Sequence, residues 1–195
     1  MSAFTNHPQK PVKGSHCATC GAPYAVPAAP AAPAAPAAPA APAAPADWPR
    51  TCAACGDTAY RNPLPVAVAL LPVTGRDGTG LVVITRTIAP QFGGVALPGG
   101  FIDHDEDWKH AVVRELREET GIEADEGDVR LADALSDPEG HLLLFGLLPA
   151  RPEAALPPSV PTDETTGFHV LGAPTELAFP LHTLAARSWF EGGYH

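Results

Sequence analysis

Three glutamates, Glu115, Glu118 and Glu119, crowd one short stretch of this chain. At about 100° per residue of an α-helix they fall at relative angles of about 0°, 300° and 40°, so their carboxylates share one helical face. Clustered oxygen ligands without His or Cys are what Mg²⁺ or Mn²⁺ prefers, and a magnesium site commonly also binds a phosphate of the substrate. Three acids on a helix are more often a solvated face, so residue type alone leaves both interpretations open.

The spacing around these glutamates is more specific. Gly100 is followed after five residues by Glu106, and after seven more by the run Arg114-Glu115-Leu116-Arg117-Glu118-Glu119-Thr120-Gly121-Ile122. This arrangement resembles the Nudix box, G-x5-E-x7-R-E-U-x-E-E-x-G-U with U an aliphatic residue, at every fixed position. The resemblance is assigned to residues 66–195 as a whole, and the box occupies residues 100–122.

The resemblance implies a site for Mg²⁺ (or Mn²⁺) that the box itself builds. The implied ligands are Glu115, Glu118 and Glu119, the backbone carbonyl of Gly100, and Glu106 as a further ligand or stabiliser. Arg114 is implied to hold Glu115 or Glu118 in place by a charge-assisted hydrogen bond.

Members of the Nudix family hydrolyse a nucleoside diphosphate linked to a further group. The expected enzyme therefore cleaves ADP-ribose, NADH or an FAD-like dinucleotide into a nucleoside monophosphate and a phosphorylated remainder. The general base is left open between Glu118, Glu119 and Glu164, which lies in the later stretch "PTDETTGF". Two alternatives remain: a nucleoside triphosphate pyrophosphohydrolase, or a Nudix fold that senses nucleotides without catalysis, against which the complete set of box carboxylates argues.

All four cysteines of the chain form two Cys-x-x-Cys pairs, Cys17 with Cys20 and Cys52 with Cys55. Two such pairs offer four thiolates for a tetrahedral, structural zinc site, with reduced metal-free thiols or a redox pair as alternatives. The lead-in "RTCAACGDTAYRNPLPVAV" is similar to the zinc ribbon that precedes the fold in some NADH or FAD pyrophosphatase-like members. After the box, however, the chain has no Ser-Gln-Pro-Trp element of the kind that marks NADH pyrophosphatases.

A repeat in which proline recurs every third residue from Pro27 to Pro45 separates the two cysteine pairs. Such a segment favours an extended or disordered conformation and serves either as a spacer or as a proline-rich ligand for a partner domain. It must bend back on itself if both cysteine pairs bind one metal ion. We therefore expect a flexible tail over residues 1–16, a zinc-ribbon-like segment over 17–57 with a disordered insert at 26–47, and a Nudix domain over 58–195.

The spacing of apolar residues predicts the strands and helices that position the box. Strands are expected at Val66–Val73, Gly80–Thr87 and Val95–Phe101, and later at Val129–Ser136, His141–Pro149 and Gly167–Leu171. A helix is expected over Trp108–Thr120, capped by Asp105 or Asp107, with acids in its first turn and Gly121 as its stop, and a second over about Leu181–Phe190. The expected fold is α/β (α+β): a Nudix-type α/β/α sandwich with a mixed sheet, in which His182 is structural.

Charge and hydropathy limit the classes of partner that the chain is expected to bind. The net charge of −10 argues against binding to nucleic acid or to anionic membranes, and the slight basic excess over residues 1–65 is too weak to support a zinc-dependent nucleic-acid binder. No run of about 18 apolar residues and no signal peptide is found, so a cytoplasmic location and no membrane partner are expected. The expected partner is a nucleotide substrate, and a homodimer is left open.

Overall fold

The computed structural model describes residues 14–24, 48–76 and 78–194 of the chain. The expected tail falls mostly, and the Pro-Ala insert at 26–47 entirely, outside the described residues. The chain divides into two compact units, Met1–Asn62 and Pro63–His195. Neither helix among the described residues has the length and apolar character needed to cross a bilayer.

The first unit is built from two small turns. Strands β1 (Arg50–Thr51) and β2 (Thr58–Ala59) pair antiparallel, and the loop between them carries the second cysteine pair. The first cysteine pair lies in a similar loop, closed by an isolated bridge between His16 and Pro23. Both pairs are therefore presented at the tip of a hairpin-like turn.

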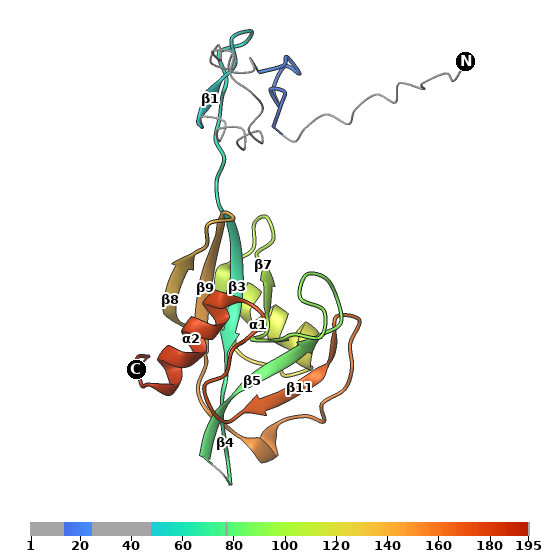
Figure 1. Cartoon of the computed structure of the whole chain (residues 1–195), viewed down its shortest axis with the longest axis vertical. Helices are drawn as coiled ribbons and strands as arrows, with labels where there is room; N and C mark the ends of the chain where they lie inside the picture. The colour runs from blue at the N-terminus through green and yellow to red at the C-terminus, as the bar shows by residue number, and fades with distance from the viewer. Residues whose placement is uncertain (1–13, 25–47, 77, 195) are drawn as a thin grey trace, which may run out of the picture. The chain divides into compact units, whose positions relative to one another are not determined.

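The second unit contains two sheets (Figure 1). The first has the order β7-β3-β9-β8, formed by β7 (Gly99–Phe101), β3 (Leu64–Leu70), β9 (His141–Leu147) and β8 (Arg130–Ser136). It is mixed, because β3 and β9 run parallel while the outer pairs are antiparallel. The second has the order β10-β4-β5-β11, with β6 also paired to β5; its strands are β4 (Pro72–Gly75), β5 (Gly78–Arg86), β6 (Val95–Ala96), β10 (Arg151–Pro152) and β11 (Thr165–Leu171).

The expectation of one strand over Val66–Val73 is wrong, since this run divides at Leu71 between β3 and β4, which belong to different sheets. The Leu70 carbonyl accepts a hydrogen bond from Leu148 N–H, whereas the Leu71 carbonyl accepts one from Val82 N–H on β5. Pro72 has no N–H with which to continue the ladder of β3. The single strand expected over Val95–Phe101 likewise divides into β6 and β7.

Helix α1 (Trp108–Thr120) has the predicted bounds. Asp107 is the cap, because its Oδ1 accepts a hydrogen bond from Lys109 N–H at 2.8 Å. Gly121 ends the helix in the left-handed conformation, with φ 72°, and donates its N–H to the Arg117 carbonyl. The expectation of acids in the first turn is wrong: the acidic residues precede the helix, and its first turn has none.

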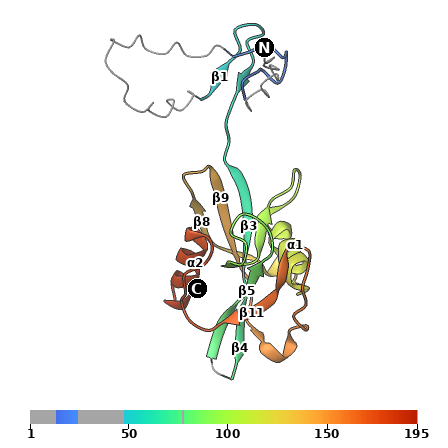
Figure 2. The ribbon, with the colours of Figure 1, turned by 45° about the vertical axis from the view of Figure 1, so that its right-hand side comes forward.

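Helix α2 (Pro180–Phe190) lies on the other side of the first sheet from α1 (Figure 2). Alternate residues of β3 point to opposite faces: Ala67 and Ala69 pack in the core beneath α1, whereas Val68 and Leu70 pack in the core beneath α2. His182 on α2 is buried, as expected of a structural residue, and its Nδ1 accepts a hydrogen bond from Leu97 N–H at 3.3 Å. The predicted α/β/α arrangement with a mixed sheet is confirmed. Two short 3₁₀ turns, Glu126–Asp128 and Glu153–Ala155, complete the described elements.

Candidate functional site

Arg114 on α1 gathers three of the box carboxylates. Its Nε and Nη2 donate to the two oxygens of Glu106 at 2.7 and 2.9 Å, and its Nη1 donates to Glu115 at 2.7 Å and to Glu118 at 3.3 Å. Nη2 also donates to the Phe101 carbonyl on β7 at 3.0 Å. The Arg114 guanidinium holds the pKa of Glu106 down at about 2. One arginine thus fixes the box loop, the helix and the end of β7 to one another.

Glu115 lies against the backbone of Gly100. A Cβ at position 100 would meet Glu115 Oε1 at 2.5 Å, so the absence of a side chain at Gly100 leaves the space that this carboxylate occupies. Burial raises the pKa of Glu115, and the Arg114 charge opposes that rise. The sequence alone explains Gly100 as a box residue, and the structure adds this steric reason.

Glu119 is the most buried acid of the box, with 3% of its surface exposed. Its Oε2 accepts a hydrogen bond from Gly99 N–H at 2.9 Å, and its backbone carbonyl accepts one from Thr165 Oγ1 at 3.1 Å. Burial raises the pKa of Glu119 to about 8, and the negative charges of Glu115 and Glu164 add to the rise. A carboxylate that is buried beside other acids favours a cation as neighbour.

Glu118 and Glu164 are the more accessible acids. The Glu118 side chain is 51% exposed, and besides its long bond to Arg114 it lies 3.8 Å from Arg117. Glu164 is exposed directly before β11, where its backbone carbonyl accepts a hydrogen bond from Thr87 N–H at 2.8 Å. The charge of Glu164 acts on both Glu115 and Glu119, so the chain brings this later acid toward the box.

The chemistry of this donor set fits a hard divalent cation, since it offers only carboxylate and carbonyl oxygens. The carboxylates are nevertheless not drawn together around one point. Across residues 14–24, 48–76 and 78–194, two groups have donor atoms that all lie within 4.8 Å of one another: the four cysteines, and Asp137 with Glu139 and His141. In the box, Arg114 supplies the positive charge and holds its three partners at its own guanidinium.

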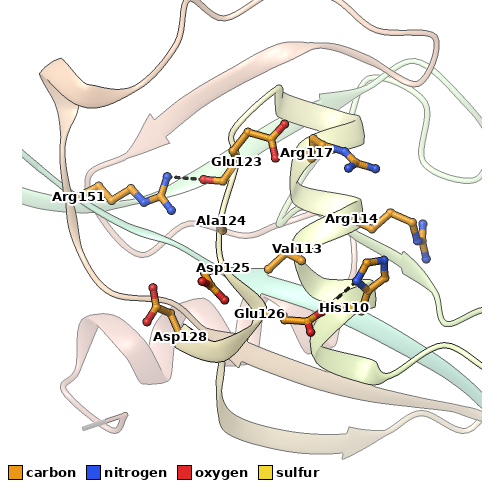
Figure 3. Close-up of a pocket in the computed structure, with 10 residues that line it drawn as sticks. All are labelled: His110, Val113, Arg114, Arg117, Glu123, Ala124, Asp125, Glu126, Asp128 and Arg151. Carbon is orange, nitrogen blue, oxygen red and sulfur yellow. Dashed lines mark hydrogen bonds and ion pairs between the residues drawn. The ribbon is translucent and has the colours of Figure 1, made fainter.

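A pocket of about 540 Å³ lies beside the box, on the side of α1 that faces the segment after it (Figure 3). Its lining includes Arg114, Arg117 and Arg151 together with four acidic residues, and Arg151 donates to the Glu123 carbonyl at 2.6 Å. The carboxylates of Glu115, Glu118 and Glu119 do not line it. The pocket is therefore adjacent to the box acids and separate from them.

The four cysteines meet in the first unit. Cys17 Sγ lies 3.7 Å from Cys55 Sγ and Cys20 Sγ lies 3.6 Å from Cys52 Sγ, which is too far for a disulfide. A tetrahedron of zinc–sulfur bonds of about 2.3 Å has S–S edges of roughly 3.8 Å, so the observed spacing fits a tetrahedral zinc site.

The two cysteine turns have the same local geometry. Gly21 N–H donates to the Cys17 carbonyl at 2.9 Å, and Gly56 N–H donates to the Cys52 carbonyl at 2.8 Å. Both glycines adopt positive φ, 74° and 78°, a backbone conformation that glycine adopts without steric cost in a tight turn. The hydrogen bond from Cys20 N–H lowers the pKa of the Cys17 thiol to about 6, which favours the thiolate that binds a metal.

Several contacts of the site carry no signal in the sequence. The Thr165 hydroxyl that holds Glu119, and the Phe101 carbonyl that accepts from Arg114, come from strands whose residue types predict nothing about the box. Gly99 is different: it precedes Gly100 directly, so a close backbone approach at that point could have been anticipated.

Comparisons with known proteins agree with this geometry. The sequence profile of the NUDIX domain matches residues 63–191. The ADP-ribose pyrophosphatase of Methanocaldococcus jannaschii is 43% identical over 63 residues, which are 32% of this chain and 37% of that protein. The match thus spans well under half the length of that relative.

Two solved structures share the fold. A NUDIX hydrolase from Nitrosomonas europaea superposes with a TM-score of 0.63 at 18% identity, covering 91% of this chain and 90% of that one. The NUDIX domain of Shewanella oneidensis NrtR, a complex with ADP ribose, gives a TM-score of 0.52 at 19% identity over 67% and 90% of the two chains. Since the profile matches more than half of the chain and the predicted box lies on the helix it requires, this protein belongs to the Nudix family.

Proposed function

We propose that this protein is a Mg²⁺-dependent pyrophosphohydrolase that cleaves the diphosphate of a nucleoside diphosphate linked to another group. The observation that carries the proposal is the packing of four glutamates, one of them almost fully buried, around Arg114 and the Gly99–Gly100 strand. Mn²⁺ has the same preference for oxygen ligands and is proposed as a substitute.

The residues proposed to hold the metal are Glu115, Glu118 and Glu119, with the Gly100 carbonyl and Glu106 beside them. Bound there, a divalent cation offsets the charge of the phosphates and lowers the pKa of a bound water. Glu118 is the acid best able to turn toward a metal, because it is half-exposed and its bond to Arg114 is the longest of the three. Arg114 would remain hydrogen-bonded to Glu106 and act as the residue that positions the box carboxylates.

The proposed reaction is attack of a water oxygen on one phosphorus of the diphosphate. The P–O bond to the bridging oxygen breaks, that oxygen leaves with the remainder as its phosphate, and the proton of the water passes to a carboxylate. Glu118 and Glu164 are the accessible candidates for this base, whereas Glu119 is held by Gly99 N–H. A half-exposed or exposed carboxylate can also return the proton to solvent.

ADP-ribose is the substrate that we propose first. One relative is named an ADP-ribose pyrophosphatase, and one neighbouring structure is a NUDIX domain in complex with ADP ribose. NADH and FAD-like dinucleotides share the adenosine diphosphate part. Nucleoside triphosphates are the rival substrates within the family.

For the first unit we propose a structural Zn²⁺ held by Cys17, Cys20, Cys52 and Cys55. The sulfur spacing and the paired turns support a closed tetrahedral site with no ligand position for a substrate. Its role is to hold the two turns of the first unit together.

The test is turnover of a panel that contains ADP-ribose, NADH, NAD⁺, FAD, diadenosine polyphosphates and nucleoside triphosphates, with Mg²⁺ or Mn²⁺. The proposal expects metal-dependent release of a nucleoside monophosphate from at least one nucleoside diphosphate derivative, lost in Glu118→Gln. Glu126→Gln is the matched control, because Glu126 lies outside the box at residues 100–122, is similarly exposed, at 58%, and is paired with His110 rather than with a box carboxylate or Arg114. Nucleotide binding without turnover would support the sensor alternative, and turnover of triphosphates alone would support the rival substrate class.

A further inference from the structure

One buried hydroxyl of the first unit has no hydrogen-bond partner. Across residues 14–24, 48–76 and 78–194, the Tyr24 hydroxyl is the one buried side-chain oxygen or nitrogen that forms no hydrogen bond. A buried hydroxyl without a partner destabilises a fold, so it indicates a functional role or a bound ion that completes its surroundings. The neighbours of Tyr24 show which role this is.

Tyr24 lies on the same face of its turn as Cys17. Cys17 N–H donates to the Ala22 carbonyl at 2.8 Å, and Tyr24 N–H donates to the Ser15 carbonyl at 2.9 Å, on either side of the isolated bridge of this turn. Successive residues of an extended chain point to opposite faces, so this pairing puts Cys17 and Tyr24 on one face as diagonal neighbours. A diagonal neighbour is within reach of an aromatic side chain.

The groups near the Tyr24 hydroxyl are acceptors of the cysteine site. Burial raises the pKa of Tyr24, and Cys17, then Cys52 and Asp57, add to the rise, so these groups lie near the hydroxyl. A phenol has a pKa of about 10 before any such rise, so the hydroxyl keeps its proton at neutral pH and can donate it. Asp57 already accepts a hydrogen bond from the Thr19 hydroxyl at 2.7 Å. The Cys17 sulfur is therefore the acceptor that the hydroxyl can serve.

Arg50 holds the Tyr24 ring beside the cysteines. Its Cζ lies 5.8 Å from the centre of the Tyr24 ring and 5.0 Å from that of the Trp48 ring, and its Nη1 donates to the Gly14 carbonyl at 3.2 Å. Cys52 follows Arg50 by two residues at the end of β1, so the two side chains share a face. Four thiolates around one Zn²⁺ leave the centre with a net negative charge, which a nearby guanidinium and a hydroxyl donor both offset.

We propose that the Tyr24 hydroxyl donates a hydrogen bond to the Cys17 thiolate when the four cysteines hold a metal ion, and that this bond strengthens metal binding. The inference rests on the structural zinc site proposed above and adds to it a positioning residue outside the two Cys-x-x-Cys pairs. The second turn has no equivalent donor, because Ala59, the register partner of Arg50, occupies the place that corresponds to Tyr24. The support is therefore one-sided, and it acts on Cys17.

The first experiment measures the zinc affinity of the full chain by competition with a chelator. Tyr24→Phe removes the hydroxyl and keeps the ring on which Arg50 stacks, and Tyr60→Phe is the matched control, since Tyr60 is 67% exposed in the same unit. The zinc dissociation constant should rise about 10- to 100-fold in Tyr24→Phe and stay within about twofold in Tyr60→Phe. An unchanged constant in Tyr24→Phe would overturn this inference alone, whereas a wild type that binds no zinc would overturn the zinc site as well.

The second experiment separates a hydrogen bond from mere packing. In the chain loaded with Co²⁺ in place of Zn²⁺, the sulfur-to-cobalt charge-transfer absorption reports on the electrons of the cysteine sulfurs. Loss of the donated hydrogen raises the energy of the Cys17 lone pair, so this band should move to longer wavelength in Tyr24→Phe and stay in place in Tyr60→Phe. A band that does not move in Tyr24→Phe, even with weaker zinc binding, would assign Tyr24 to packing and overturn the hydrogen bond.

Discussion

Replacing Arg114 by Gln should strongly destabilise the fold. The side chains of Arg114, Glu106 and Glu115 are 17%, 9% and 12% exposed, and Arg114 supplies the only positive partner at hydrogen-bond distance that the described residues give Glu106. Removing one partner from a pair with so little exposure leaves an uncompensated carboxylate, which costs about 3–5 kcal/mol of the free energy of unfolding.

Arg117→Gln is the matched control on the same helix. Its side chain is 51% exposed and lies 3.8 Å from Glu118, so its loss should cost less than about 0.5 kcal/mol. Urea denaturation followed by circular dichroism compares the two variants with the wild type. Added Mg²⁺ should narrow the gap for Arg114→Gln, because a divalent cation takes over the counter-charge. A cost below about 1 kcal/mol, or an equal cost for Arg117→Gln, would refute the assignment of Arg114 as the centre of the site.

Three further changes test other parts of the molecule. Burial lowers the pKa of His182 to about 3, so the neutral ring stabilises the fold above pH 6.5 and this contribution falls as the pH drops below 6.5. Between pH 7.5 and 5.5 the free energy of unfolding of the wild type should therefore fall by about 1.4 kcal/mol relative to that of His182→Gln, a comparison that cancels the titration of the other groups. Gly100→Ala should weaken the binding of Mg²⁺ about tenfold or more in a metal-dependence assay, because the new Cβ would displace the carboxylate of Glu115. The melting temperature should stay within a few degrees of the wild type, because the displaced group is the end of a flexible side chain. Elemental analysis should find one zinc per wild-type chain and none in Cys52→Ser; a zinc-free wild type would leave the four cysteines as thiols.

The sequence specifies the bounds of α1 closely because the cap, the stop and the apolar spacing agree, although the acids expected in its first turn precede it. Asp107 caps, Gly121 stops, and the apolar positions Ala111, Val112 and Leu116 face the core at helical spacing. The two Cys-x-x-Cys pairs likewise predicted a shared zinc site, on the condition that the Pro-Ala repeat between them bends back, and the structure brings the four sulfurs together.

The division of Val66–Val73 between two sheets was not readable, because a buried run of apolar residues has no period that marks a crossing. At the box, the family resemblance implied one partner for Arg114, either Glu115 or Glu118, whereas the guanidinium reaches three carboxylates and a carbonyl. Contacts between distant strands, such as Thr165 with Glu119 or Phe101 with His141, depend on sheet order and register, which one sequence does not fix.

Glu119 is both the most buried acid of the box and a proposed metal ligand. Glu119→Gln keeps the shape of the side chain and removes an ionisable carboxyl from a site that is 3% exposed, so the variant should be at least as stable as the wild type without metal. The same change removes a proposed metal ligand.

The most direct measurement is therefore the rate at which AMP is released from ADP-ribose as Mg²⁺ is raised, for the wild type beside Glu119→Gln at equal fold stability. We predict that release requires Mg²⁺ in the wild type and falls at least about 100-fold in the variant. Release that needs no divalent cation, or that is unchanged in Glu119→Gln, would contradict a metal-dependent site built by the box.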